Sequence, residues 1–421
     1  MQNQSENRKR TAVYSIAHFL MDMFCAFLVF RFLKGSSVWM ECLLIYNFFA
    51  FAVQMPLGLV ADKFGKNRKI AAGGFLLLAL CYFVVTLTCG IQNGSLLSDT
   101  VNALKGAALQ GDVIPKGAAV LVAAVTGLGN AMFHVGGGLE VLNGSDTGSM
   151  ASCGSLGIFV SPGALGLYIG TLMANTRGLM IPLLAGLFIL FTGIILLLLP
   201  IKDTVNAEFT IKFRPYIQEN LMNQQKNKQM CNRDKRMNDQ WNNQQDKRMN
   251  DQRNSQTGGI TLALLCLFLV VCLRSYLGLT MQFQWKAEYG FISVLAVVLG
   301  KTAGGFASDL FGAGKTAVVS LGAAAVCFLF GNIPLIGILA VFLFQMTMPI
   351  TLKAASVYLN GAKGFAFGLL TFALFVGFLI PYLDIKPLFS GGVRYAVIAA
   401  VSLPLLVLGL WKIKKKGDIM K

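Results

Sequence analysis

Twelve apolar segments constrain what this 421-residue chain can fold into more than any other feature. Each has about the twenty residues that an α-helix needs to cross roughly 30 Å of hydrocarbon, whereas the strands of a membrane barrel would appear as short alternating segments. Hydrophobic residues make up 55% of the chain and charged residues 13%, which a soluble domain would struggle to keep in water. We therefore expect an all-α integral membrane protein. The segments cover residues 12–33, 38–60, 69–90, 117–139, 149–173, 178–200, 260–282, 290–309, 315–331, 333–356, 364–383 and 393–412.

The distribution of charge predicts the orientation. The formal net charge of +17 could suggest a nucleic-acid partner, but it does not form one basic patch. Basic residues gather instead in alternate connections and in the last turn, which carries Lys414, Lys415 and Lys416. This positive-inside bias predicts a multi-pass protein of the cell membrane, with both termini in the cytoplasm and no nucleic-acid partner.

A short pattern occurs twice, each time where an apolar segment ends. The first copy contains Gly58, Asp62, Gly65, Lys66 and Arg68, and the second contains Gly305, Asp309 and Gly312. Both copies read Gly-x-x-x-Asp-x-x-Gly, which predicts two related halves.

The halves are expected at residues 1–200 and 259–421, each a bundle of six helices. Residues 201–258 are rich in Asn, Gln, Lys, Arg and Asp, and they repeat the heptapeptide Asp-Lys-Arg-Met-Asn-Asp-Gln. Because such a segment cannot bury enough apolar surface to fold alone, it is interpreted as a disordered cytoplasmic linker.

Few polar residues lie inside the apolar segments, and each is a candidate for function because an ionisable group in hydrocarbon costs at least ~2.5 kcal/mol. His18 and Asp22 are four residues apart, on one face of the first helix. Asp22 is interpreted either as a proton-binding carboxylate or as a structural partner of His18 or of a distant arginine. The other candidates are Asn130, His134, Arg274, Lys301, Gln345 and Lys353.

Three of these residues have a second interpretation. Arg274 could form an ion pair that locks the halves or could bind an anionic substrate. His134 could be a packing histidine as readily as a ligand. Lys353 is expected to extend its ammonium group to the membrane interface.

Several catalytic patterns are missing from the sequence. There is no Gly-x-x-x-x-Gly-Lys-Ser/Thr phosphate loop, no His-Glu-x-x-His zinc motif and no Gly-x-Ser-x-Gly nucleophile elbow. The nine cysteines include no Cys-x-x-Cys pair, and only two histidines are present. We therefore expect neither an enzyme nor a protein with a cofactor or a metal site.

The repeated motif, the two groups of six helices and the long middle connection resemble the major facilitator superfamily of transporters. Within it, three local patterns most resemble the fosmidomycin-resistance type of efflux transporter: His18-x-x-x-Asp22, Gly127-Leu-Gly-Asn-Ala-Met-Phe-His134 and Arg274-Ser-Tyr-Leu-Gly. Val135 departs from that group, which has proline there. Ser161 occupies a glycine position of the antiporter motif. The resemblance implies that helices 1, 4, 7 and 10 line a central cavity.

The expected function is proton-coupled efflux of a small solute or drug by alternating access. Asp22 and His18 would carry the proton, while Asn130, His134, Arg274, Lys301 and Gln345 would contact the substrate. One acid against two intramembrane cations favours an anionic or zwitterionic substrate. The repeated motif would form the gate, and the protein would act as a monomer in the bilayer. The alternatives are a proton-coupled importer of an organic anion or sugar, and a non-transporting membrane sensor with the same fold.

Overall fold

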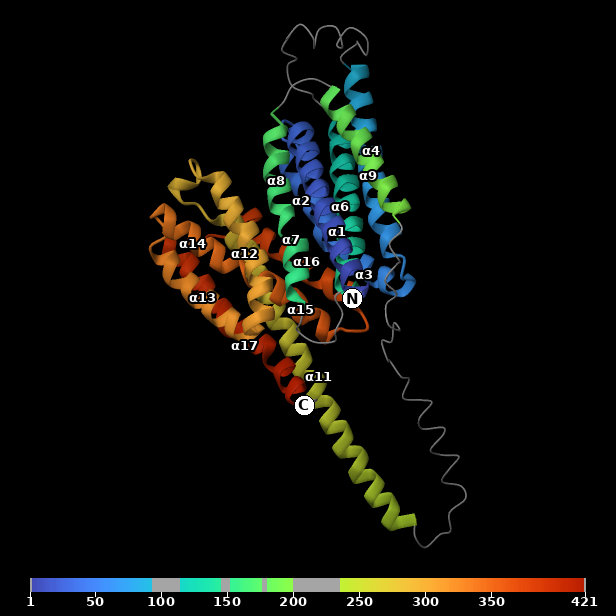
Figure 1. Ribbon diagram of the computed structural model, residues 1–421, viewed down its shortest axis with the longest axis vertical. Helices are drawn as coiled ribbons and strands as arrows, with labels where there is room; N and C mark the ends of the chain where they lie inside the picture. The colour runs from blue at the N-terminus through green and yellow to red at the C-terminus, as the bar shows by residue number, and fades with distance from the viewer. Residues whose placement is uncertain (1, 93–113, 145–151, 176–179, 200–234, 420–421) are drawn as a thin grey trace.

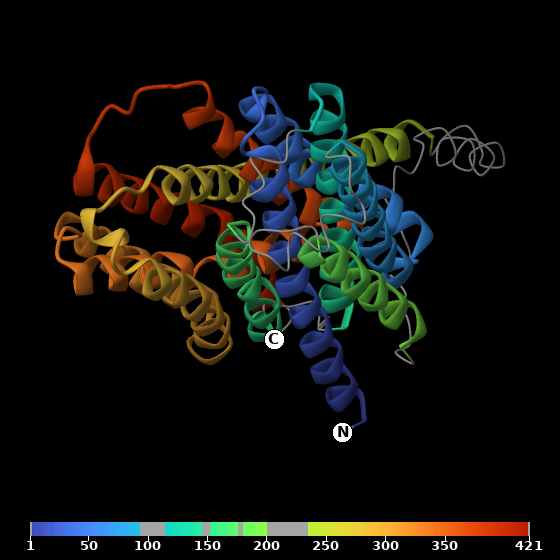
Figure 2. The ribbon, with the colours of Figure 1, turned by 90° about the horizontal axis from the view of Figure 1, so that it is seen from above.

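The computed structural model describes residues 2–92, 114–144, 152–175, 180–199 and 235–419, and these are almost entirely helical. Figure 1 shows the amino-terminal helices (blue to green) beside the carboxy-terminal helices (yellow to red), and the end-on view of Figure 2 shows the same two groups. The first half contains α1 (Gln2–Leu28), η1 (Val29–Leu33), α2 (Trp39–Asn47), η2 (Phe48–Ala52), α3 (Gln54–Phe64), α4 (Asn67–Gln92), α6 (Lys116–Gly144), α7 (Cys153–Val160), α8 (Pro162–Met173) and α9 (Met180–Leu198). The second half contains α11 (Lys235–Thr280), η4 (Gln284–Lys286), α12 (Gly290–Phe311), α13 (Ala313–Leu329), α14 (Pro334–Gln345), α15 (Met348–Tyr358), α16 (Lys363–Tyr382) and α17 (Gly391–Ile419).

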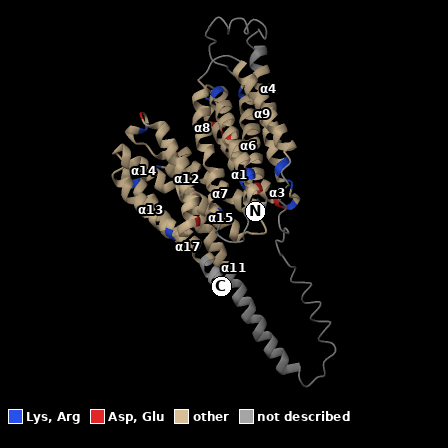
Figure 3. Cartoon of the chain, viewed as in Figure 1, with Lys and Arg blue, Asp and Glu red and all other residues tan. Residues whose placement is uncertain are grey.

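The expected all-α membrane fold is confirmed. Among the described residues, eleven helical segments are long and apolar enough to cross a membrane, and α13 is a shorter apolar helix. Together they match the twelve predicted segments. Figure 3 shows that the described charged residues lie mainly near the helix ends, as expected of helices whose middle parts face hydrocarbon.

The predicted disordered linker is wrong in its second part. Residues 200–234 lie outside the described residues, but α11 begins at Lys235 and continues without a break to Thr280. Residues 235–257 contain no glycine or proline and are rich in the helix formers Lys, Arg, Gln and Met. Because they extend a membrane helix that has already nucleated, helix formation there needs no new nucleus. The division into halves at this connection stays a prediction.

Glycines hold the two halves together at one end of the molecule, called here the N-terminal face, where α7 and α16 begin. On one side α3 lies so close to α16 that a methyl group at Gly58 would collide with the backbone of Gly364. On the other side a Cβ atom at Gly305 of α12 would lie 2.6 Å from the carbonyl oxygen of Cys153 in α7. Small residues permit this approach without a hydrophobic driving force between the helices.

Candidate functional site

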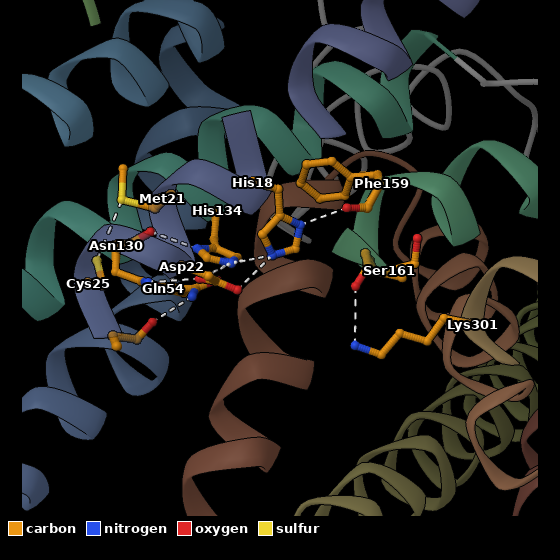
Figure 4. Close-up of polar contacts among 12 residues, drawn as sticks. His18, Met21, Asp22, Cys25, Gln54, Asn130, His134, Phe159, Ser161 and Lys301 are labelled. Atoms are coloured by element: carbon orange, nitrogen blue, oxygen red, sulfur yellow. Dashed lines mark hydrogen bonds and ion pairs between the residues drawn. The ribbon is translucent and has the colours of Figure 1, made fainter. Parts of the chain in front are cut away.

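Four of the predicted site residues form one buried group, called here the histidine–aspartate cluster: His18 and Asp22 from α1, and Asn130 and His134 from α6 (Figure 4). Asp22 Oδ2 lies 3.2 Å from His18 Nε2, and Asp22 Oδ1 lies 3.6 Å from His134 Nε2. Asn130 Nδ2 donates to Asp22 Oδ1 at 3.3 Å. Both pairs are spaced i,i+4, so each helix presents its two side chains on one face, and α1 packs directly on α6.

The hydrogen bonds of the two imidazole rings fix their tautomers. His18 Nδ1 lies 2.7 Å from the carbonyl oxygen of Phe159, and His134 Nδ1 lies 2.9 Å from that of Asn130. A carbonyl oxygen can only accept, so both Nδ1 atoms carry hydrogen and a neutral ring is left with a bare Nε2. These two Nε2 atoms face each other at 2.9 Å, beside the carboxylate of Asp22. The two Nε2 atoms and the carboxylate of Asp22 therefore converge on one point inside the first half.

A helix break positions the cluster against the second half. α7 ends at Val160 and α8 begins at Pro162, whose ring nitrogen has no hydrogen to donate. Side chains engage three successive carbonyl oxygens at this break. Ser161 Oγ donates to Ile158 O at 3.2 Å, His18 Nδ1 to Phe159 O, and Lys301 Nζ to Val160 O at 3.2 Å. The break thus connects the cluster to Lys301 of α12 in the other half (Figure 4).

The side chain of Arg274 contacts its own half. It is buried in α11 and donates to Thr347 Oγ1 at 2.8 Å and to Thr351 Oγ1 at 3.2 Å, at the start of α15. These contacts stay within the second half, so they form no lock between the halves. The expectation that Lys353 reaches the membrane interface is wrong. Lys353 is only 2% exposed, because α15, which carries it, packs against α16 and α7.

Gln345 lines a half-open cavity of about 270 Å³ near the end of the molecule opposite the N-terminal face. The cavity lies between α8, α11, α12 and α14, and most of its lining is apolar. Lys286 in the connection before α12 contributes the one positive charge of that lining, and burial lowers the pKa of its ammonium group. Tyr168 is the lining residue from the first half. Sequence reasoning missed Lys286 and Tyr168 because both lie near segment ends, where polar and aromatic residues are common.

The two aspartates of the repeated motif make equivalent contacts across the halves. Asp62 accepts hydrogen bonds from the backbone N–H groups of Gly364 and Phe365 at 2.8 and 2.9 Å, at the start of α16. Asp309 accepts from the N–H groups of Cys153 and Gly154, both at 2.8 Å, at the start of α7. Each carboxylate therefore satisfies two free donors of a helix N-terminus and interacts favourably with its dipole.

The other motif residues have local roles. Gly65 and Gly312 have φ values of +64° and +89°, which let the chain turn after α3 and α12. Arg68 donates to the carbonyl oxygen of Leu199, within the first half. The side chain of Lys66 is exposed.

A buried ion pair near the N-terminal face was also missed. Arg10 Nε of α1 lies 3.3 Å from Glu140 Oε2 of α6, and both side chains are buried. Neither Arg10 nor Glu140 was among the predicted site residues, and Glu140 falls one residue beyond the predicted fourth segment. A lone acid directly after a glycine-rich span was the signal that could have found it.

Known structures identify the fold. The chain is similar to a major facilitator superfamily transporter, FucP, solved in the outward conformation, with a TM-score of 0.59, 11% identity, and coverage of 95% of this chain and 99% of that chain. It is also similar to a variant of the E. coli fucose:proton symporter FucP, with a TM-score of 0.60, 10% identity, and coverage of 96% and 98%. Neither a protein-family model nor a curated protein matches the sequence.

Both structures belong to transporters, and the similarity extends over almost the whole of each chain. At these identities it concerns the fold alone. The chain thus has a fold used by secondary transporters, specifically the twelve-helix major facilitator fold.

Proposed function

We propose that the protein is a secondary active transporter that moves a small anionic or zwitterionic solute or drug out of the cell by proton-coupled alternating access. One observation carries this proposal. A buried carboxylate with two imidazoles in the first half is joined, through the carbonyl oxygens of a broken helix, to a partly buried lysine of the second half. Burying these groups is costly in a membrane protein, and a site that binds and releases charge gives a reason to retain them.

The coupling proton is proposed to bind in the histidine–aspartate cluster. With both Nδ1 atoms committed to carbonyl oxygens, a proton on one Nε2 donates to the other and is stabilised by Asp22. The other charged group facing the cluster is Lys301. His18 Nδ1 and Lys301 Nζ donate to the neighbouring carbonyl oxygens of Phe159 and Val160, so a movement of the His18 ring on release of the proton would be transmitted to Lys301. FucP is described as a fucose:proton symporter, which supports proton coupling on this fold.

Substrate is proposed to bind between the halves, where Lys301, Arg274 and Gln345 supply donors and the cavity beside Gln345 gives access. Two cations against one cluster acid favour an anionic or zwitterionic molecule. The aspartates Asp62 and Asp309 act as the cytoplasmic gate, closed in this conformation because both helix N-termini are engaged. The protein works as a monomer in the cytoplasmic membrane, with both termini inside.

Transport in proteoliposomes tests this function. Vesicles containing pyranine report proton movement when a panel of organic anions and zwitterionic drugs is added under an imposed pH gradient. We expect a substrate-dependent proton flux that Asp22→Asn lowers at least tenfold, because the neutral amide removes the charge that holds the proton. Asp384→Asn, an exposed loop residue at φ +53°, is the control and should transport like the wild type. An Asp22→Asn protein with full gradient-driven accumulation contradicts the proton site.

Two alternatives give different results. An importer of an organic anion or sugar accumulates substrate on the side to which protons flow, and its deletion impairs growth on that solute instead of raising drug sensitivity. A non-transporting sensor shows a flux no higher than empty vesicles across the panel but is still stabilised by its ligand, by about 2.7 kcal/mol at 100 times the dissociation constant.

A further inference from the structure

The centre of the histidine–aspartate cluster has the geometry of a metal site. His18 Nε2, His134 Nε2 and a carboxylate oxygen of Asp22 all lie within 4.8 Å of one another. The two Nε2 atoms are 2.9 Å apart, His18 Nε2 lies 3.2 Å from Asp22 Oδ2, and His134 Nε2 lies 3.6 Å from Asp22 Oδ1. Two atoms bound to one tetrahedral Zn²⁺ at about 2.0–2.1 Å are themselves about 3.4 Å apart, so an ion between the two imidazoles and either carboxylate oxygen requires the Nε2 atoms to separate by about half an ångström.

Each of the three ligand groups is oriented by a second contact. Both histidines donate Nδ1–H to a backbone carbonyl oxygen, which leaves Nε2 free to bind an ion. Asn130 holds the carboxylate through Nδ2. In metal sites the ligating histidine characteristically donates its other N–H in this way, and this fixes the ring orientation and raises the basicity of the ligand. The tautomers that a metal needs are therefore present before any metal binds.

The backbone beside the cluster also suits an ion. α8 passes so close that a Cβ atom at Gly163 would contact both Asp22 Oδ2 and His18 Nε2. Glycine keeps this position free of a side chain next to two of the three ligand atoms. Three protein ligands also leave a coordination position for water.

We propose that His18, His134 and Asp22 bind one divalent transition-metal ion, of which Zn²⁺ is the representative, in competition with the proton. Two imidazoles and one carboxylate suit Zn²⁺, Co²⁺ or Ni²⁺, whereas Mg²⁺ and Ca²⁺ require mainly oxygen ligands. A bound ion supplies the positive charge that the facing Nε2 atoms and the carboxylate require. It also fixes α1 to α6 and holds the cluster in one state. This proposal does not depend on transport, because it concerns binding to the resting protein.

Spectroscopic titration of the purified full-length protein, with a tag that contains no histidine, tests the proposal. Co²⁺ should bind with a stoichiometry of one, give visible absorption bands typical of a tetrahedral site, and be displaced by Zn²⁺. His18→Gln and His134→Gln should each weaken binding more than about 100-fold, because each removes a direct ligand. Asp384→Asn should bind like the wild type.

A second measurement uses the wild-type protein and therefore does not depend on the folding of variants. The chain has only two histidines, so ¹⁵N labelling of histidine gives four ring signals in all. Zn²⁺ should shift the two Nε2 signals strongly and leave the two Nδ1 signals in their protonated range. The proposal is overturned if Zn²⁺ shifts neither Nε2 signal, or if both histidine variants bind Co²⁺ with wild-type affinity. Either result leaves the transport proposal standing, since proton-driven flux through the unmetallated protein is measured separately.

Discussion

The carboxylate of Asp62 accepts a hydrogen bond of 2.8 Å from the backbone N–H of Gly364, which lies 302 residues further along the chain. Asp309 makes the equivalent contact to Cys153 in the opposite direction, so each half contributes one acid and one helix N-terminus. The sequence repeat is thus also a repeat of contacts. Because both contacts join the halves at the same face, loss of either should loosen that face.

Substitution of Asp309 should expose Cys153. In a protein that keeps Cys153 as its only cysteine, Asp309→Ala should raise the rate of maleimide labelling about tenfold, since loss of such a cap costs about 1 kcal/mol and the dipole interaction adds to it. Cys153 is fully buried in the closed state and therefore reports opening directly. Asp384→Asn serves as the control and should label at the parent rate. An unchanged rate in Asp309→Ala means that this contact does not hold the face closed.

A disulfide should lock the same face. Ser308 of α12 lies beside the side chain of Cys153 in α7, so Ser308→Cys should form a disulfide with the native cysteine under mild oxidation. The expected results are a mobility shift on non-reducing gels after proteolysis between the halves, and a loss of transport that dithiothreitol reverses. Ser293→Cys lies on the same helix but lines the cavity beside Gln345. It should form no disulfide with Cys153 and should keep its transport activity under oxidation. Full transport by the oxidised Ser308→Cys protein contradicts a gate at this position.

A methyl group at Gly163 should disrupt the histidine–aspartate cluster. Gly163→Ala places Cβ against Asp22 and His18, so α8 or α1 has to move and the thermal midpoint should fall by several degrees. Proton-coupled flux should fall with it. The matched control is Gly278→Ala in α11, where nothing lies within 4 Å and the added methyl should be neutral or stabilise by about 0.5–1 kcal/mol. Equal effects of the two substitutions contradict the close approach at Gly163.

The buried pair of Arg10 and Glu140 should contribute strongly to stability. Glu140→Gln leaves the exposed carboxylate of Glu6, 3.5 Å away, as a counter-charge for the buried guanidinium, so the loss should approach but stay below the value of about 3–5 kcal/mol that is typical of an unpaired buried charge. The double variant Arg10→Met, Glu140→Leu should recover much of that loss, because no unpaired charge remains buried. Thermal unfolding in detergent followed by intrinsic fluorescence measures both. A single variant as stable as the wild type excludes a structural role for the pair.

Much of the architecture was predictable because the thickness and the low polarity of the membrane constrain the length and composition of each helical segment separately. The twelve segments, the repeat around Asp62 and Asp309, and the few intramembrane polar residues all follow from runs of apolar residues interrupted by charge. The i,i+4 spacings of His18 with Asp22 and of Asn130 with His134 also predicted shared helix faces. The helical start of α11 was missed because a polar composition was interpreted as disorder, although it contains good helix formers.

The sequence by itself therefore determined the membrane helices and the candidate polar residues, and it predicted two related halves. Only the tertiary structure decided which of those residues meet. It brings His18, Asp22, Asn130 and His134 together, attaches Lys301 to Val160, and directs Arg274 to Thr347 and Thr351 instead of Asp22. The physical reason is that helix periodicity is local, whereas these contacts depend on the rotation and close approach of helices more than a hundred residues apart. Glycines and one broken helix set that approach, and their partners cannot be found from one segment alone.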